Sequence, residues 1–395
     1  MKSIYLLLFI LAIVSAENWA VLVCGSKLYG NYRHHADVAH AYQILKKGGF
    51  LEDHIITLMY NDVPFDKYNP FKGQLFNRPG DDSPDVYEGV VVDYEKEMVN
   101  PEILIKVLTG DESAGGKVLK STKDDNVFLF FSDHGSEDLL SLPGGYLHSK
   151  DLLDAIQIMH ERQMYKKFLL YIEACYSGSM FLNLPEDLNV VAVTAANAEE
   201  SSWGWYCDDE AIIKGKDIGS CLGDEFSISW MEHVDNIDRK ESIEDQFNYL
   251  VKQVTKSHVS RYGDTSFKND SIGEFIGFAS SENTPVESQY SFHHWDSRDN
   301  KLLFLRYKAD HSSGVNKEKW ESAVKEELTH RSEIDKYFSS LTSNPHYYKS
   351  SGGVKDFNCY KRAIAEFTSQ FGMSDYGLKY FDVFANMCNE DRNAF

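Results

Sequence analysis

The chain has 395 residues, of which 43% are hydrophobic and 26% charged, a composition typical of a globular protein with one large domain and a smaller one. Its 40 Lys and Arg against 61 Asp and Glu give a formal net charge of −21, which argues against nucleic acid or an anionic membrane as the main partner. Such acidity is tolerable in an acidic compartment, where carboxylates are partly protonated and repel one another less.

The first sixteen residues have the pattern of a secretory signal. Lys2 supplies a positive start, Ile4 to Val14 an apolar core, and Val14-Ser15-Ala16 a small-residue cleavage site. This core is shorter than the ~20 residues that span a bilayer, and no later segment is long enough either, so we expect no membrane span. In this secretory context, Asn269 begins the one usable N-glycosylation sequon.

Apolar runs of strand length alternate with helical periodicity through the first 280 residues. The expected strands are Trp19 to Cys24, Ile55 to Tyr60, Val127 to Phe131, Phe168 to Ile172 and Val190 to Thr194. Helices are expected over residues 38–47, from Pro101 behind an Asn100 cap, and behind a Ser149 cap. This alternation predicts an α/β domain with helices on both faces of a mainly parallel sheet.

The character of the sequence changes after Phe278. Residues 279–300 contain Ser, Asn, Pro and His without periodicity, which indicates an exposed linker. Helical spacing returns from about Glu318, and short helices are expected over residues 354–388. We therefore divide the chain into four parts: a signal peptide (1–16), an α/β domain (17–279), a linker (280–317) and an all-α domain (318–395).

Six cysteines behind a secretory signal invite disulfide pairing. Cys207 and Cys221 lie close together in a polar stretch, and Cys359 and Cys388 share the C-terminal region, so we expect these two pairs. Cys24 ends an apolar strand and is most simply a buried free thiol.

Two expected strands end in residues that are useful only where a strand opens into a site. The run FLFFSDHG ends at His134 and Gly135, and the run FLLYIEACYSGS carries Cys175, 41 residues after the histidine. Parallel strands bring their carboxyl ends to one sheet edge, so an imidazole meets a thiol there. The imidazole promotes formation of the nucleophilic thiolate and protonates the leaving amine, while the N–H groups of Gly135 and Cys175 form an oxyanion hole. The pattern predicts a cysteine protease.

Five segments carry a resemblance to a known family: GNYRHHADVAHAYQI, SDHGS, YIEACYSGSM, TAANAEESSW and CLGDEFSISWME. In this order they resemble the signature segments of the legumains, the asparaginyl endopeptidases of peptidase family C13. The resemblance covers residues 19–278 and continues more weakly through the helical tail. It implies a caspase-like three-layer sandwich with a His–Cys dyad, followed by a helical inhibitory prodomain behind an activation peptide.

The resemblance also implies a pocket that reads asparagine. It places Arg33 as a donor to the substrate amide and Glu173 and Asp224 as acceptors, which matches a carboxamide with one acceptor oxygen and a two-donor NH₂. Three further residues are placed nearby: Asn31, His34 and Ser202. Aspartate suits this pocket only when protonated, so cleavage after Asp is expected mainly at acid pH. Surface ion pairs are the alternative, which is weakest for Glu173 inside an apolar run.

A protease whose site opens at the surface needs a cover before secretion, and the helical tail can provide one. Self-cleavage in the linker would remove it, with Asn300, Asn316 and Asn283 as candidates. We expect an inactive full-length protein that shortens itself when acidified, in a lysosome- or vacuole-like compartment or outside the cell. The expected partners are Asn- or Asp-containing protein substrates, the chain's own prodomain and cystatin-type inhibitors.

No cofactor or metal ion is expected, because His293 and His294 lack further ligands at useful spacing. Asp133 either tunes His134 or caps the strand end. Other functions stay open beside the protease: a peptide ligase of the same family, and a secreted binding protein on a disabled protease scaffold. The GPI transamidase catalytic subunit shares the dyad, but its family carries a C-terminal membrane anchor that is not visible here.

Overall fold

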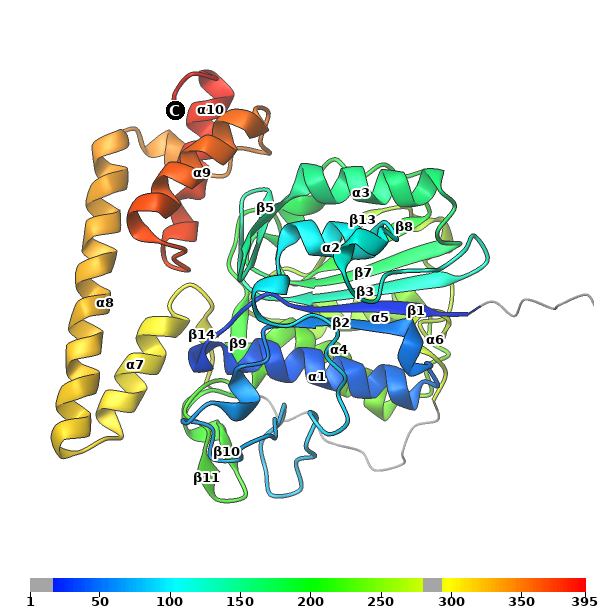
Figure 1. Ribbon diagram of the computed structural model, residues 1–395, viewed down its shortest axis with the longest axis horizontal. Helices are drawn as coiled ribbons and strands as arrows, with labels where there is room; N and C mark the ends of the chain where they lie inside the picture. The colour runs from blue at the N-terminus through cyan, green and yellow to red at the C-terminus, as the bar shows by residue number, and fades with distance from the viewer. Residues whose placement is uncertain (1–16, 280–292) are drawn as a thin grey trace, which may run out of the picture.

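A computed structural model of the chain describes residues 17–279 and 293–395. The expected signal peptide and the candidate cleavage site Asn283 lie outside these residues. Figure 1 shows a layered α/β body with the C-terminal helices standing beside one end of its sheet.

The central sheet within residues 17–279 has the strand order β13-β8-β7-β3-β1-β2. Its strands are β1 (Trp19–Cys24), β2 (Ile55–Met59), β3 (Asn126–Ser132), β7 (Lys167–Glu173), β8 (Val190–Thr194) and β13 (Ser260–Gly263). All neighbours are parallel except β13, which pairs antiparallel with β8 at one edge. The expected mainly parallel sheet is confirmed. The polar, half-buried edge strand β13 was not expected, because it has no apolar run.

Helices cover both faces of the sheet, as Figure 1 shows. They are α2 (Pro101–Leu108) and α3 (Ser149–Glu161) on one face, and α1 (Tyr32–Lys47), α4 (Glu225–Asn236), α5 (Ile243–Gln253) and α6 (Gly273–Ile276) on the other. Val21 packs in the cluster under α2 and α3, whereas Leu22 packs in the cluster under α1 and α4, which is the alternation of a strand. The expected three-layer α/β sandwich is therefore confirmed.

Two helix starts test the expected caps. Asn100 caps α2, its Oδ1 accepting a hydrogen bond from the N–H of Ile103 at 2.9 Å. Ser149 is the first residue of α3 rather than its cap, and its hydroxyl donates to Asp138 instead.

Short strands form further small sheets outside the central sheet. A three-stranded antiparallel sheet follows His134 directly: β4 (Gly135–Ser136), β5 (Leu139–Leu142) and β6 (Gly145–His148). A second small sheet has the order β12 (Gly223–Asp224), β9 (Trp203–Trp205) and β14 (Trp295–Asp296). A separate pair is β10 (Ile212–Ile213) with β11 (Lys216–Asp217).

The described end of the linker is built into the molecule. Trp295, Ser297, Arg298 and Asn300 are buried, so the expectation of an exposed linker is wrong for this stretch. The helices begin at Asn300 rather than near Glu318: α7 (Asn300–Asp310), α8 (Gly314–Leu341), α9 (Phe357–Phe371) and α10 (Phe381–Glu390). Helix α7 was not predicted from the sequence, because its apolar residues are not confined to one face of the helix.

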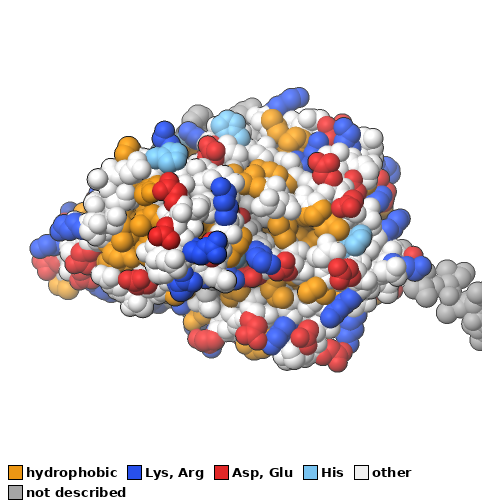
Figure 2. Space-filling view, turned by 90° about the horizontal axis from the view of Figure 1, so that it is seen from above, with side chains coloured by type: hydrophobic (Ala, Val, Ile, Leu, Met, Phe, Trp, Pro, Cys, Tyr) orange, Lys and Arg blue, Asp and Glu red, His pale blue; other side chains and the backbone are white. Residues whose placement is uncertain are grey.

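Both expected disulfides, Cys207–Cys221 and Cys359–Cys388, are present, and Cys24 is a buried free thiol. Asn269 is exposed. Among the described helices, none is long and apolar enough to cross a membrane. On the face shown in Figure 2, acidic, basic and hydrophobic side chains are interspersed, so this face is not one continuous acidic field.

Candidate active site

The carboxyl ends of β3 and β7 bring the expected dyad to one edge of the sheet. Ser132 and Glu173 are register partners on these strands, and His134 and Cys175 each follow two residues later. Both side chains are buried. Among the described residues no hydrogen bond joins them. The thiol instead accepts from the backbone N–H of Ser202 at 3.3 Å and lies 3.8 Å from its hydroxyl.

Asn31 fixes the tautomer of His134. Its Oδ1 lies 3.2 Å from Nε2 of His134, and Nη1 of Arg33 donates to the same oxygen at 3.3 Å. A guanidinium has only donors, so the oxygen end of the amide must face Arg33. Nε2 therefore carries the proton, and Nδ1 of His134, which has no hydrogen-bond partner among the described residues, is left as the base.

The dyad of this full-length form is uncharged. Burial lowers the pKa of His134 to about 4, with Asp375 opposing and Arg298 reinforcing that shift. Burial also raises the pKa of the Cys175 thiol, an effect that Arg298 opposes and Asp296 reinforces. At neutral pH the imidazole is therefore neutral and the thiol protonated, which is the unreactive state of the pair.

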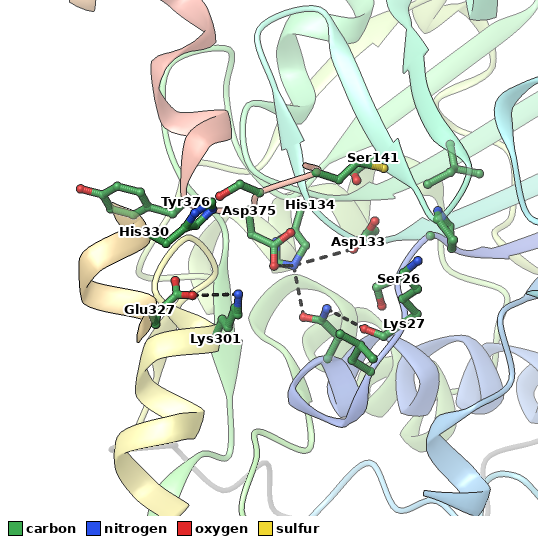
Figure 3. Close-up of a pocket in the computed structure, with 17 residues that line it drawn as sticks. Ser26, Lys27, Asp133, His134, Ser141, Lys301, Glu327, His330, Asp375 and Tyr376 are labelled. Atoms are coloured by element: carbon green, nitrogen blue, oxygen red, sulfur yellow. Dashed lines mark hydrogen bonds and ion pairs between the residues drawn. The ribbon is translucent and has the colours of Figure 1, made fainter. Parts of the chain in front are cut away.

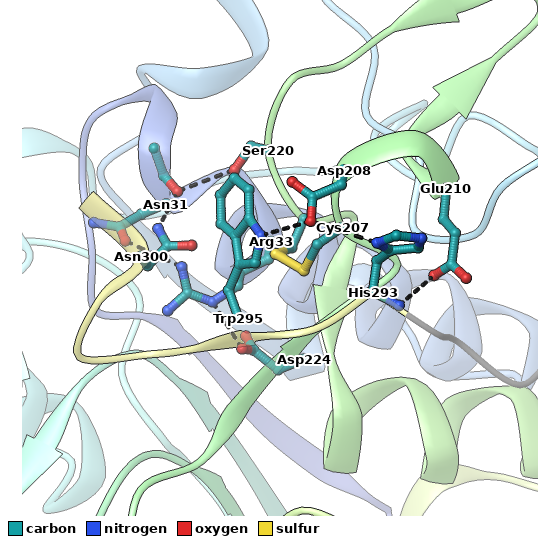
Figure 4. The surroundings of a disulfide bond; sticks show 12 residues. Asn31, Arg33, Cys207, Asp208, Glu210, Ser220, Asp224, His293, Trp295 and Asn300 are labelled. Atoms are coloured by element: carbon teal, nitrogen blue, oxygen red, sulfur yellow. Dashed lines mark hydrogen bonds and ion pairs between the residues drawn. A yellow bond between two sulfur atoms is a disulfide. The ribbon is translucent and has the colours of Figure 1, made fainter. Parts of the chain in front are cut away.

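The three residues of the expected specificity pocket lie together. Nε of Arg33 donates to Oδ1 of Asp224 at 2.7 Å (Figure 4). Oε2 of Glu173 accepts from the N–H and the hydroxyl of Ser227 at 3.1 and 3.0 Å. Each of the three is buried, and one atom of each has no hydrogen-bond partner among the described residues: Arg33 Nη2, Glu173 Oε1 and Asp224 Oδ2.

Burial raises the pKa of Glu173 and of Asp224, and Arg33 opposes the shift at Asp224. A third carboxyl that the sequence did not single out, Asp37, lies in the same group. Its Oδ1 accepts from Asn77 at 2.9 Å, and burial, reinforced by the charge of Asp224, holds its pKa well above the usual range. The group thus contains one cation and three carboxyls, and burial favours the protonated form of each carboxyl.

His34 and Asp133 connect the pocket to the dyad. Nδ1 of His34 lies 2.8 Å from the Ser26 hydroxyl and 3.3 Å from Asp133 Oδ1, and its Nε2 lies 3.5 Å from Asp224 Oδ2. Ligand atoms of His34, Asp133 and His134 lie within 4.8 Å of one another, so the described residues contain a group able to hold a metal ion. Sequence spacing gave no sign of it, because His34 comes from a different segment.

Position 135 has no room for a residue larger than glycine. A Cβ at this position would collide with the carbonyl oxygen of Cys175. The backbones that follow the two strands therefore meet directly, which is the approach an oxyanion hole of two N–H groups needs.

The candidate processing sites differ in accessibility. Asn300 is 2% exposed at the first residue of α7, and its Nδ2 donates to the carbonyl oxygen of Gly30. Asn316 is exposed in the first turn of α8. Cleavage at either requires local unfolding of a helix, because a protease binds an extended chain.

Two protein families match this sequence. The Peptidase C13 family matches residues 18–278, and the legumain prodomain matches residues 322–394. The chain belongs to the peptidase C13 family. It is a cysteine endopeptidase of the legumain type with a C-terminal prodomain.

Curated relatives of this C13 peptidase match along most of its length. It is 39% identical to the vacuolar-processing enzyme delta-isozyme of Arabidopsis thaliana, covering 94% of this chain and 86% of the relative. It is 35% identical to legumain of Canavalia ensiformis, covering 94% and 85%. A solved structure, caspase-1 of Spodoptera frugiperda, is similar at 10% identity over 68% of this chain and 92% of that chain, with a TM-score of 0.38. At that score the likeness adds nothing to the sheet order described above.

The prodomain of this C13 peptidase reaches the dyad itself. Oδ2 of Asp375 lies 3.4 Å from Nε2 of His134, and a pocket between them is lined from both domains (Figure 3). On the far side of that pocket, Lys301 of α7 pairs with Glu327 of α8 at 2.7 Å. The prodomain therefore contacts His134 at Nε2, the same ring nitrogen that Asn31 contacts.

Proposed function

We propose that this peptidase hydrolyses peptide bonds after asparagine, and after aspartate at acid pH. The observation that carries the proposal is a set of three buried polar atoms without a hydrogen-bond partner among the described residues: a donor on Arg33, an acceptor on Glu173, and an acceptor on Asp224 that has only the 3.5 Å contact with His34. A carboxamide matches that set: its oxygen accepts from the guanidinium, and its two N–H groups donate to the carboxylates. Leaving such buried groups unpaired is costly, so a side chain that pairs all three is strongly preferred.

Cys175 and His134 supply the chemistry of this proposal. Nδ1 of His134 removes the thiol proton, and the sulfur attacks the carbonyl carbon of the bound residue. The N–H groups of Gly135 and Cys175 stabilise the oxyanion. The C–N bond then breaks as the imidazolium returns its proton to the leaving amine, and water hydrolyses the acyl-enzyme. Asn31 acts as a positioning residue, because it holds Nε2–H.

The full-length chain is proposed to be a zymogen. Linker residues Trp295 and Asp296 pair with β9, the prodomain contacts His134, and the dyad is uncharged. Acid is proposed to release this cover, with cleavage at Asn283, Asn300 or Asn316. The relatives named vacuolar-processing enzymes support an acidic vacuole- or lysosome-type compartment as the place of action, reached through the secretory pathway.

The test uses two fluorogenic peptides that differ only in Asn or Asp at the cleaved position. After acid activation, the Asn peptide is cleaved at pH 5, and a thiol alkylator abolishes the turnover. Cleavage of the Asp peptide falls up to tenfold per pH unit above the usual carboxyl pKa of about 4, because only the protonated side chain mimics the amide. Cys175→Ala is inactive and does not shorten itself. Equal cleavage of a peptide with Gln at that position would refute the pocket assignment.

A further inference from the structure

Arg298 is a buried cation with no hydrogen-bond partner among the described residues. Its Nε, Nη1 and Nη2 all lack one, although the side chain is only 5% exposed. Burying a guanidinium in this way is costly unless another group attracts it. The carboxylates of Asp296 and Asp382 attract it electrostatically, and the ring centre of Tyr176 lies 5.1 Å from the guanidinium carbon, within the range of a cation–π contact.

The register of β14 shows where Arg298 lies relative to a substrate. β14 pairs antiparallel with β9, and one residue further the N–H of Ser297 donates to the carbonyl oxygen of Ser202 at 3.2 Å. Ser202 in turn donates its own N–H to the sulfur of Cys175. Ser297 thus lies beside the nucleophile, in the place of the residue to be cleaved. Arg298 is the next residue, in the place of the first residue on the leaving-group side.

Tyr176 is held at that place by the catalytic domain itself. It directly follows Cys175 and adopts a left-handed conformation with φ of 56°. Its hydroxyl donates to Asp382 of the prodomain at 3.4 Å. Asp382 leaves with the prodomain after cleavage at any of the candidate sites. Arg298 leaves with it after cleavage at Asn283, whereas after cleavage at Asn300 or Asn316 it lies near a new chain end and must move off the ring before a substrate binds. The ring itself stays with the nucleophile.

We propose that Tyr176 is a specificity-determining residue of the activated enzyme, whose ring favours substrates with Arg or Lys directly after the cleaved residue. In the zymogen Arg298 occupies the place that such a side chain takes. The proposal rests on the proposed cleavage after Asn and adds the residue on the other side of the scissile bond. A cation over a partly exposed ring gives an advantage of about threefold to tenfold in kcat/KM.

The experiment uses acid-activated enzyme and peptides that share one sequence up to Asn and differ in the next residue. That residue is Arg, Lys, or citrulline, which keeps the shape of arginine and lacks its charge. In the wild type we expect kcat/KM for Asn-Arg to exceed that for Asn-citrulline about threefold to tenfold. Tyr176→Phe keeps the preference, and Tyr176→Leu brings the ratio close to one.

The ratio within one enzyme sample is the readout, so it does not depend on the fraction of folded or activated protein. An equal rate for Arg and citrulline in the wild type overturns the proposal even if Tyr176→Leu fails to fold. A ratio that survives in Tyr176→Leu overturns it as well, because the preference then comes from another group. Failure of the wild type to cleave any Asn peptide is a different result, which refutes the proposed function itself.

Discussion

Two groups of buried carboxyls lie near the same catalytic edge, and they are stabilised in different ways. In the pocket, Arg33 is bonded to Asp224 within the catalytic domain, and Glu173 is bonded to Ser227 of the same domain. The second group lies where the two domains meet, and its members are Glu137, Asp138 and Asp382.

Among the residues that the structure describes, no cation is bonded to the interface group. Oε1 of Glu137 accepts from the hydroxyl of Ser351 and the N–H of Gly353, each at 3.0 Å, and Asp138 accepts from the N–H of Val354 at 2.6 Å. Burial raises the pKa of Glu137 to about 8, with Asp382 reinforcing the shift, and that of Asp138 to about 6. Protonation of Glu137 and Asp138, rather than a bonded cation, therefore reduces the negative charge of the interface group.

The two groups therefore differ in whether activation changes their surroundings. The charge balance of the pocket comes from residues of one domain and survives activation. The hydrogen bonds from Ser351, Gly353 and Val354 to the interface group exist only while the prodomain is docked, so the proton affinity of this group reports docking. Replacing residues of the pocket should abolish the activity, whereas replacing residues of the interface group should change the pH at which the activity appears.

Replacing Arg33 is expected to have the largest effect. Arg33→Met leaves Asp224 and Glu173 as uncompensated buried carboxyls, which costs about 3 kcal/mol of folding free energy. It also removes the donor for the substrate oxygen, so kcat/KM for Asn peptides falls at least about a thousandfold. Thermal unfolding and peptide hydrolysis measure the two effects. Arg33→Lys keeps the positive charge but loses the planar, two-pronged donor of the guanidinium. It should therefore restore the free energy of unfolding more than it restores the activity. Near-normal cleavage after Asn by Arg33→Met would contradict the pocket.

Glu137→Gln tests the interface group with a smaller change. The pKa of Glu137 is raised when the prodomain is docked, so its contribution to docking is complete below about pH 4.5 and is lost as pH rises through about 8. Gln keeps an acceptor oxygen and cannot ionise. Docking should therefore strengthen by about 2 kcal/mol near pH 8 and change little at pH 5.

The measurement for Glu137→Gln is the thermal midpoint of the full-length chain at pH 5, 6.5 and 8, in a Cys175→Ala background that prevents self-cleavage. Glu186→Gln, an exposed position in the catalytic domain, is the matched control. A midpoint at pH 8 that stays equal to that of the parent would show that Glu137 is ionised in the docked form at little cost.

These contrasts also show which parts of the molecule a sequence can predict. The five parallel strands were predicted because a strand buried on both faces is a continuous apolar run. The position of His134 and Cys175 followed from strand ends. By contrast β13, β14 and α7 were missed, because their burial comes from the surfaces they pack against. The family is confirmed by the comparisons, while the residue roles stay predictions.

Within the site, the sequence could not predict contacts between distant segments. Asn31 was expected beside the substrate, and the structure places it between Arg33 and His134, where it sets a tautomer. Asp37 lies inside an ordinary amphipathic helix, and its membership of the pocket depends on β12. Glu137 follows the dyad histidine closely, yet its proton affinity depends on a prodomain more than 200 residues later in the sequence.

Replacing His148 is expected to have the smallest effect, and its influence on docking changes with pH in the opposite direction to that of Glu137. It ends β6 beneath α9, where its ring contacts Phe357 and Tyr360 at centroid distances of 6.2 and 5.8 Å. Burial lowers its pKa to about 4; Lys361 of the prodomain reinforces the shift, and Asp151 opposes it. Docking over a neutral imidazole is favourable above about pH 6.5 and weakens as pH falls toward 4, so His148 favours release in acid while Glu137 favours docking.

His148→Gln should therefore delay acid activation. With the imidazole gone, docking at pH 5 strengthens by about 1 kcal/mol, and the pH at which the chain shortens itself falls by roughly half a unit. Time courses of shortening from pH 6.5 to 4 measure this midpoint, and His54→Gln, at the amino end of β2, is the matched control. Because His134 also lies buried under the prodomain with a pKa near 4, some acid response should remain. A complete loss of that response would mean that His148 alone senses acid, whereas an unchanged midpoint would assign the sensing to His134, the residue that Asp375 contacts.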